Sequence, residues 1–189
     1  GLRRERGCVC VVGGGKGGAL ERVVRARGGR SELNCCSVNG PRALGMISDW
    51  ALMTGKDGLT VNWYGLGTMQ ARVAGTTIVV AQDTDYPVEP SVVLRVTPKR
   101  AAEFTLRLRI PGWSDRTRVR VNGEAVAGVK AGSYLSIRRR WKRGDHVEVR
   151  FDFRLHRWVG ERECRGLTSL YRGPLLLTYD RRFNDCDPD

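Results

Sequence analysis

From residue 59 onward, apolar and polar residues alternate in short runs that end at turn-forming residues. The clearest run is 104–110, Phe-Thr-Leu-Arg-Leu-Arg-Ile, in which every second residue is apolar. This period-two alternation is typical of a strand with one buried face. Further strand-like runs occupy residues 60–64, 77–81, 92–97, 119–121, 135–137, 147–153, 168–171 and 175–179. Because no helical pattern separates these runs, the sequence predicts a mainly β fold, an antiparallel β-sandwich.

Two turn signals divide the predicted strands. Asn122-Gly123 is a strong hairpin signal. Residues 142–145 form the second, and they include the tripeptide Arg143-Gly144-Asp145, which resembles an adhesion motif. Its place between two strand-like runs favours a simpler interpretation, a hairpin turn.

One helix is predicted ahead of the strands. Gly40-Pro41 marks its start, because proline at the first helical position loses no internal hydrogen bond. Thr54-Gly55 supplies a glycine stop. The apolar residues at helical spacing are Leu44, Ile47 and Ala51, with Trp50 beside them. A single helix cannot bury this stripe alone, so we expect it to face the sheet or a partner outside the chain.

Composition is that of a soluble fold, with 41% hydrophobic and 28% charged residues among 189. The net charge of +13 is compatible with a nucleic-acid or acidic partner. However, arginine is spread along the whole chain and alternates with apolar residues on predicted strands, as at Arg107 and Arg109. Such arginines commonly line a solvated sheet face. We therefore favour that interpretation, and a basic nucleic-acid-binding domain is the weaker alternative.

The chain contains no apolar run long enough to cross a bilayer, so no membrane partner is expected. The N-terminus lacks the pattern of a signal peptide, which favours the cytoplasm. Residues 1–30 are rich in Gly and Arg and have no aromatic residue, so we expect them to be poorly ordered or atypical. Residues 13–18 fit G-x-G-x-x-G, but a dinucleotide site requires a parallel βαβ unit, which the following strands do not provide.

The six cysteines favour metal or redox chemistry over a disulfide framework, because the chain is not small and shows no secretory context. Cys8 and Cys10 are spaced too closely for a typical structural zinc site. Cys35 and Cys36 are more informative, since they lie just ahead of the predicted helix, whose positive end favours thiolates. A thiolate is both a nucleophile and a zinc ligand. Two small buried apolar residues, or a strained vicinal disulfide, are the alternative interpretations of this pair.

Residues 32–42, Glu-Leu-Asn-Cys-Cys-Ser-Val-Asn-Gly-Pro-Arg, resemble the Cys-Cys segment of the family 127 glycoside hydrolases, the β-L-arabinofuranosidase family. The likeness extends from about residue 31 to about residue 183. It continues in segments 58–64, 104–113, 121–124, 133–141, 144–147 and 171–175. Ile-Pro-Gly-Trp at 110–113 and Arg-Gly-Pro-Leu at 172–175 also occur in other sandwich-bearing hydrolases, so the ordered combination with Cys-Cys is the specific feature.

The resemblance implies an (α/α)6 barrel followed by β-sandwich domains. Residues 31–57 would be the last part of the barrel, with one helix left over from it, 58–183 the sandwich and 184–189 a tail. It further implies retaining hydrolysis of β-L-arabinofuranosides or related plant-type glycans, with Cys35 as the nucleophile that forms a thioether-linked glycosyl-enzyme. Cys36 would be a zinc ligand, and the metal would hold both Cys35 and Cys36 as thiolates.

The chain also departs from the family pattern. The family completes its zinc site with an upstream Glu-x-Cys motif, which Cys8 and Cys10 do not match. The acid/base glutamate belongs to the missing barrel, and Glu32 is more simply an exposed charge at the helix entry. We therefore expect a carbohydrate substrate and a missing N-terminal helical barrel as partners. The chain alone should neither hold zinc tightly nor hydrolyse glycosides.

A non-catalytic carbohydrate-binding or structural sandwich is the main alternative. Its stacking platforms would be Trp63, Trp113, Trp141 or Trp158. The lone histidines, His146 and His156, are expected to have hydrogen-bonding roles at the surface.

Overall fold

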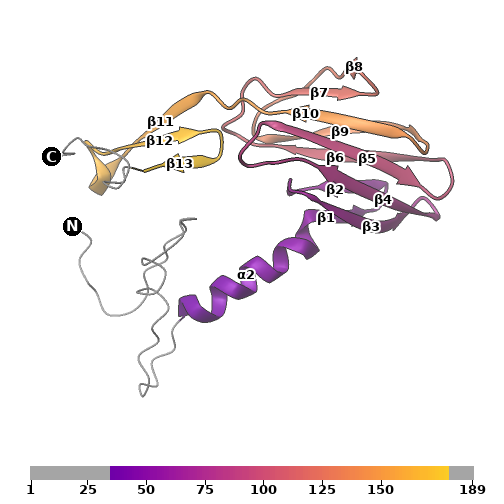
Figure 1. Cartoon of the computed structure of the whole chain (residues 1–189), viewed down its shortest axis with the longest axis horizontal. Helices are drawn as coiled ribbons and strands as arrows, with labels where there is room; N and C mark the ends of the chain where they lie inside the picture. Colours follow the sequence, from indigo (N-terminus) through magenta and orange to yellow (C-terminus); the bar gives the residue numbers. More distant parts are fainter. Residues whose placement is uncertain (1–34, 179–189) are drawn as a thin grey trace. The chain divides into compact units, whose positions relative to one another are not determined.

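The computed structural model describes residues 35–178 (Figure 1). The chain divides into two compact units, residues 1–49 and residues 50–189, which are described separately. The predicted atypical segment 1–30 and the tail 184–189 lie outside the described residues. In the described part, one α-helix precedes a series of strands, which confirms the mainly β fold. No helix in this part is long and apolar enough to span a membrane.

Helix α2 (Cys35–Ala51) begins earlier and ends earlier than the sequence predicts. Pro41 lies inside the helix rather than at its first position. At that position proline removes one internal hydrogen bond, and its ring crowds the carbonyl four residues back. Gly55 is not a helix stop either. It belongs to β1 (Leu52–Gly55), which follows the helix directly and forms a hairpin with β2 (Gly58–Val61). A boundary between residues 57 and 58 therefore falls at this hairpin.

Two sheets form the sandwich. The first has the order β1-β2-β6-β9, and the second has the order β3-β4-β5-β10-β7-β8. All neighbouring strands are antiparallel except β2 and β6, which are parallel. The remaining strands of the first sheet are β6 (Ala102–Ile110) and β9 (Ser133–Trp141). Those of the second are β3 (Gly67–Val73), β4 (Thr76–Asp83), β5 (Ser91–Pro98), β7 (Arg118–Val121), β8 (Glu124–Ala125) and β10 (Asp145–Arg150).

The core lies between these two sheets and confirms the predicted alternation. The side chains of 104, 106, 108 and 110 in β6 are buried, and Arg107 and Arg109 are partly or fully exposed. The largest fully buried side chains come from both sheets: Leu59, Leu106, Leu108, Ile110 and Trp141 from the first, and Ile78, Val80, Val92, Leu94, Val96 and Val147 from the second.

The predicted hairpin at Asn122-Gly123 is confirmed. The second predicted hairpin is wrong, because the turn there joins strands of different sheets. Asn122 and Gly123 have φ angles of 52° and 86° and close the β7–β8 hairpin. The turn after Trp141 is not a hairpin, because β9 belongs to the first sheet and β10 to the second. A tight turn resembles a hairpin in sequence, but here Gly144, with φ 93°, lets the chain cross between the layers.

A third, separate sheet follows the sandwich. It contains β11 (Leu155–Val159), β12 (Thr168–Arg172) and β13 (Leu175–Leu177), with the short 3-10 helix η1 (Arg162–Cys164) between its first two strands. Apolar side chains are exposed on this sheet, including Trp158, Leu170 and Leu176.

Candidate active-site helix and the joint at its end

Cys35 and Cys36 form the first two residues of helix α2. This corrects the expectation that they precede the helix by several residues. The first four N–H groups of a helix have no internal acceptor, and the positive end of the dipole lies there. In general, such a helix N-terminus favours the thiolate form of a cysteine. The side chains of both cysteines lie outside the described residues, as do Cys8, Cys10 and Cys186 and the predicted G-x-G-x-x-G loop and Glu32.

The residues described by the structure do not assemble a complete zinc site. No group of three or more His, Cys, Asp or Glu side chains in this part is placed to hold a metal ion. Structural and catalytic zinc sites take at least three protein ligands, and adjacent cysteines supply two. Cys164 is exposed and forms no disulfide.

The two histidines lie elsewhere. His146 Nε2 is 3.3 Å from Glu148 Oε1 on the outer face of the second sheet. The His156 ring stacks on Tyr171, with 5.3 Å between ring centroids. Both contacts are structural.

A small hollow of about 220 Å³ beside the β1–β2 turn is lined by two carboxylates, Asp57 and Glu103. Arg107 donates to both oxygens of Asp57, at 2.9 and 2.8 Å, and this hydrogen bonding holds the pKa of Asp57 below its ordinary value. Glu103 accepts a 3.0 Å bond from Arg138 Nε. A glycosidase general acid needs a raised pKa so that it holds its proton at neutral pH. Asp57, whose pKa is lowered, does not meet that requirement.

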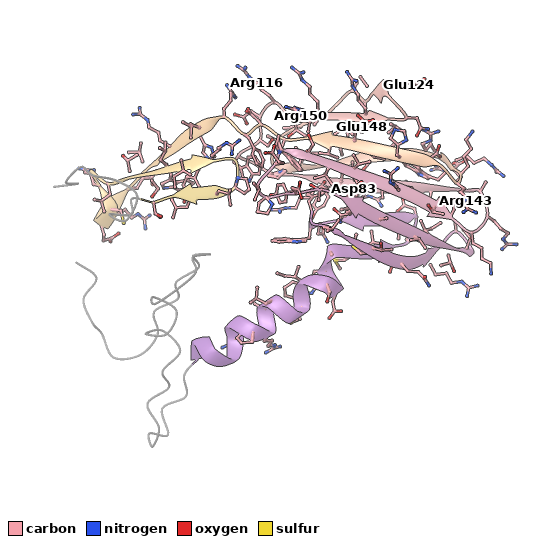
Figure 2. All side chains as sticks on the ribbon, in the orientation of Figure 1. Asp83, Arg116, Glu124, Arg143, Glu148 and Arg150 are labelled. Carbon is pink, nitrogen blue, oxygen red and sulfur yellow. The ribbon has the colours of Figure 1, made fainter. Side chains whose placement is uncertain are left out.

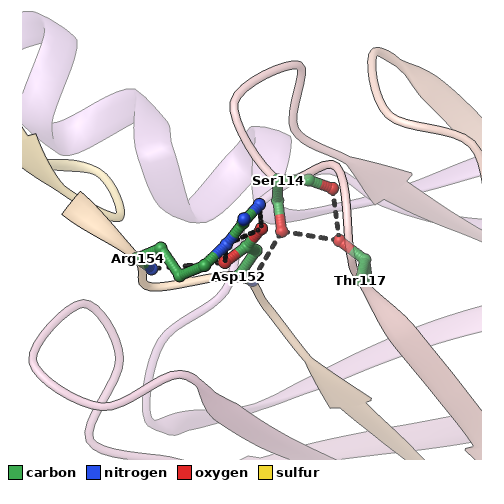
Figure 3. A network of polar contacts seen from close by, with 4 residues as sticks. All are labelled: Ser114, Thr117, Asp152 and Arg154. Carbon is green, nitrogen blue, oxygen red and sulfur yellow. Dashed lines mark hydrogen bonds and ion pairs between the residues drawn. The ribbon is translucent and has the colours of Figure 1, made fainter. Parts of the chain in front are cut away.

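The remaining carboxylates with displaced pKa values are also structural (Figure 3). Arg154 Nε lies 2.8 Å from Asp152 Oδ1, and its hydrogen bonding lowers the pKa of Asp152 to about 2. The backbone N–H of Asp152 donates to Ser114 Oγ, which lies 2.6 Å from Thr117 Oγ1. Together these bonds fix the chain where it leaves β10.

Asp145 shows the same pattern in a more buried position. Its side chain is 2% exposed, and burial alone would raise its pKa. Hydrogen bonds from the Lys142 N–H at 2.9 Å and Asn122 Nδ2 at 2.8 Å outweigh burial and lower the pKa. A buried aspartate cannot be presented to a receptor, which excludes an adhesion role for 143–145. Every carboxyl group between residues 35 and 178 with a displaced pKa is thus displaced downward.

A polar joint secures the C-terminal end of helix α2. The backbone N–H of Asn62 donates to Ala51 O at 3.0 Å, and Asn62 Nδ2 donates to Trp50 O at 3.0 Å. Tyr134 Oη then donates to Asn62 Oδ1 at 2.6 Å. The last carbonyl groups of a helix have no N–H donor within the helix. Asn62 supplies a donor to two of them. Asn62 follows β2 and Tyr134 belongs to β9, so the first sheet is bonded to residues 50 and 51, which lie in the same compact unit.

Neither Asn62 nor Tyr134 stands out in the sequence as a functional residue, although both lie in segments that resemble family 127. Periodicity gives no signal for the joint, because Asn62 and Tyr134 are outside the buried pattern. Their separation of 72 residues becomes a contact only through the β6–β9 pairing and the parallel β2–β6 pairing.

Replacing Asn62 with alanine should loosen this joint. The substitution removes the exposed bonds to the Trp50 carbonyl and the Tyr134 hydroxyl, where water can replace the lost partner, and we expect a loss of about 0.5–1.5 kcal/mol in the free energy of unfolding. Circular dichroism should also show reduced helix content. Tyr134→Phe is the matched control, because it removes one of the two side-chain bonds and should cost less. Equal stability of wild type and Asn62→Ala would contradict the joint.

The other resemblance segments also form packing contacts. Tyr64 Oη donates to the Arg109 carbonyl at 2.9 Å, and burial raises the pKa of this tyrosine. Trp113 packs against Phe151 and Phe153 with 5.9 Å between ring centroids in each case.

The four tryptophans considered as sugar platforms have different environments. Trp141 is fully buried and donates its N–H to the Phe104 carbonyl at 3.1 Å, so it cannot stack on a sugar. Trp113 is partly buried in the aromatic cluster. Trp63 and Trp158 are 48% and 67% exposed.

Comparison with known families decides the class of this chain. The sequence model described as "Beta-L-arabinofuranosidase, GH127 middle domain" matches residues 58–153, just over half of the chain. The chain belongs to family 127 of the glycoside hydrolases. The match covers both sheets of the sandwich, from β2 to the end of the Ser114–Asp152 network.

Solved structures agree with this assignment to family 127. A family 127 β-L-arabinofuranosidase from Geobacillus stearothermophilus T6 is 35% identical, with a TM-score of 0.69 over 76% of this chain and 24% of the other. A protein described as a glycoside hydrolase is 31% identical, with a TM-score of 0.70 over 77% of this chain and 25% of the other. The family 127 β-arabinofuranosidase BT3674 is 29% identical, with a TM-score of 0.68 over 76% and 26%. This family member thus spans about a quarter of the length of these structures. No curated protein sequence matches the chain.

Proposed function

We propose that this chain is part of a retaining glycoside hydrolase that acts on β-L-arabinofuranosides or related plant-type glycans, with Cys35 as its nucleophile. The observation that carries the proposal is the position of Cys35 and Cys36 at the start of a helix whose other end is bonded to a family 127 middle domain. Both solved relatives described as arabinofuranosidases share this domain at 29–35% identity.

The proposed reaction has two steps. The Cys35 thiolate attacks the anomeric carbon and forms a C–S bond as the bond to the leaving oxygen breaks, and that oxygen takes a proton from a general acid. A water molecule then gives up a proton to the same group and displaces the sulfur, which restores the thiolate and releases the sugar with retained configuration. The helix N-terminus contributes to this step by stabilising the negative charge of the thiolate.

Zinc is the proposed cofactor, with Cys35 and Cys36 among its ligands. When bound, it would hold the cysteines as thiolates at neutral pH. The remaining ligands and the general acid are proposed to come from an N-terminal helical barrel. Two observations support a contribution from outside: residues 35–178 assemble no group of three metal ligands, and their displaced carboxyl pKa values are all lowered.

The test compares this chain alone with a chimera in which it replaces the corresponding part of the Geobacillus enzyme. We expect the chain alone to hold no stoichiometric zinc by metal analysis and to release no p-nitrophenol from p-nitrophenyl β-L-arabinofuranoside. The chimera should do both, and Cys35→Ser should abolish its turnover. Cys164→Ser is the control, because that cysteine is exposed and unbonded.

Each outcome has a distinct meaning. Turnover or tight zinc binding by the chain alone would contradict the need for the barrel. An active Cys35→Ser chimera would remove Cys35 as the nucleophile. The exposed indoles of Trp63 and Trp158 favour the second candidate, a non-catalytic carbohydrate-binding sandwich, and that role predicts glycan binding by the isolated chain without any dependence on Cys35.

A further inference from the structure

The outer face of the second sheet carries a row of arginines that the reaction does not use. Arg116, Arg118 and Arg120 are exposed and alternate with the inward-facing residues 117, 119 and 121, which are buried. Arg118 and Arg120 belong to β7, and Arg116 lies in the turn before it. Alternate residues of a strand are about 6.8 Å apart, so Arg118 and Arg120 leave the same face of the sheet in succession. Residues 117, 119 and 121 are buried, and they anchor this segment to the core.

A fourth arginine lies beside the row from the neighbouring strand. Arg150 of β10 is the Cα partner of Arg118 of β7, so two like charges stand directly opposite each other. Such a pair is destabilising unless something else compensates the charge. Arg150 Nη1 is bonded to Ser91 Oγ at 3.3 Å, a neutral partner that removes none of this charge. Figure 2 shows Arg116, Glu148 and Arg150 on this part of the sandwich.

Three acidic side chains near these arginines are bonded to other groups: Glu148, Asp83 and Asp152, the last of which also attracts Arg116. Glu148 is the Cα partner of Arg120, but its carboxylate lies 3.3 Å from His146. Asp83 is paired with Arg95 at 3.6 Å. Among the described residues, no carboxylate lies within ion-pair distance of the four arginines, defined here as the arginine row: Arg116, Arg118, Arg120 and Arg150.

We propose that the arginine row binds an acidic polysaccharide through its uronate carboxylates. A guanidinium group offers two parallel N–H donors that match a carboxylate, and this pairing is stronger and more directional than that of a lysine. A repeating anionic polymer would also screen the opposed pair of Arg118 and Arg150. This binding is separate from turnover at Cys35 and would retain the enzyme on an acidic glycan matrix.

Two observations favour a polysaccharide over a nucleic acid. Non-specific recognition of single-stranded nucleic acid combines basic groups with aromatic rings for base stacking. The outward-facing residues of β5, β7 and β10 include no Trp, Tyr or Phe. In addition, the chain belongs to a family of carbohydrate-active enzymes.

The experiment titrates the full chain with polygalacturonate and, separately, with neutral arabinan, at about 0.1 M salt, where the Debye length is about 10 Å. We expect polygalacturonate to bind and arabinan to bind much more weakly at this face. The variant Arg118→Gln, Arg120→Gln, Arg150→Gln should lose at least tenfold in affinity for polygalacturonate. Its thermal midpoint should stay the same or rise, because the opposed charges are removed.

The matched control removes the same charge elsewhere, with Arg72→Gln, Arg140→Gln, Arg157→Gln, three arginines that are also exposed. It should retain most of the affinity. An equal loss of affinity in both variants would mean that binding depends only on the net charge of the chain, and this would overturn the proposal. Tighter binding to single-stranded DNA than to polygalacturonate at the same salt would overturn it in favour of a nucleic-acid surface. Neither outcome depends on turnover, so this test and the test of Cys35 can fail independently.

Discussion

Replacing Gly58 with alanine should destabilise the sandwich by about 3 kcal/mol or more. Gly58 lies where β2 runs parallel to β6, and it is the Cα partner of Thr105. A Cβ atom at this position would lie 1.8 Å from the Thr105 carbonyl oxygen, a backbone atom that cannot rotate away. The strands would have to separate, which would also break the bond from the Thr105 N–H to the Asp57 carbonyl. Urea unfolding followed by tryptophan fluorescence measures the loss.

Gly67→Ala is the control for this substitution. Gly67 also lies in a strand, but a Cβ added there has no neighbour within 4 Å. We expect its free energy of unfolding to stay within about 0.5 kcal/mol of the wild-type value. If Gly58→Ala were as stable as Gly67→Ala, β2 would not run against β6 as described.

Truncating Trp141 to alanine should cost about 3–5 kcal/mol. Its ring is fully buried and stacks on Phe104 with 5.8 Å between centroids. Its N–H also satisfies the Phe104 carbonyl, so the truncation would leave both a cavity and an unpaired buried acceptor. The thermal midpoint and the urea midpoint should both fall.

Trp158→Ala provides the comparison, since it removes the same indole from a site that is 67% exposed. Its effect on unfolding should stay within about 0.5 kcal/mol. Similar losses in the two variants would mean that Trp141 is not a core residue. Comparison of the two variants also distinguishes a tryptophan of the core from one that is exposed and able to stack on a sugar.

Local patterns in the sequence predicted most strands, because burial of one sheet face imposes the alternation directly. The run 104–110 and the Asn122-Gly123 turn depend only on neighbouring residues, and both are confirmed. The family assignment also followed from ordered short segments, and the match to residues 58–153 confirms it.

Predictions that depended on distant partners were less accurate. The helix start was placed at Gly40-Pro41 because proline is favoured there, yet the helix tolerates Pro41 inside and begins at Cys35. Leu52–Gly55 looked like the end of a helix, but pairing with β2 makes it a strand. The turn at 142–144 could not reveal that its two strands belong to different sheets.

The catalytic role of Cys35 and the zinc-binding role of Cys36 remain predictions. Sequence placed both residues near a helix N-terminus, and the described backbone places them within its first turn. The side chains of both cysteines lie outside the described residues, so their proposed chemistry is tested only by experiment. The Asn62–Tyr134 bond depends on long-range structure, since neither residue carries a distinguishing local signal.

The parallel pairing of β2 with β6 has a consequence for the order of folding. Asp57 and Thr105 meet across 48 residues of chain, and closing such a loop costs conformational entropy before its contacts form, so this pairing is expected to form late. During synthesis, the helix with its cysteines leaves the ribosome well before β6 does. The segment at the end of that helix therefore reaches its final anchorage only after most of the sandwich has been made, so maturation of the cysteine-bearing helix is timed by the strands that follow it.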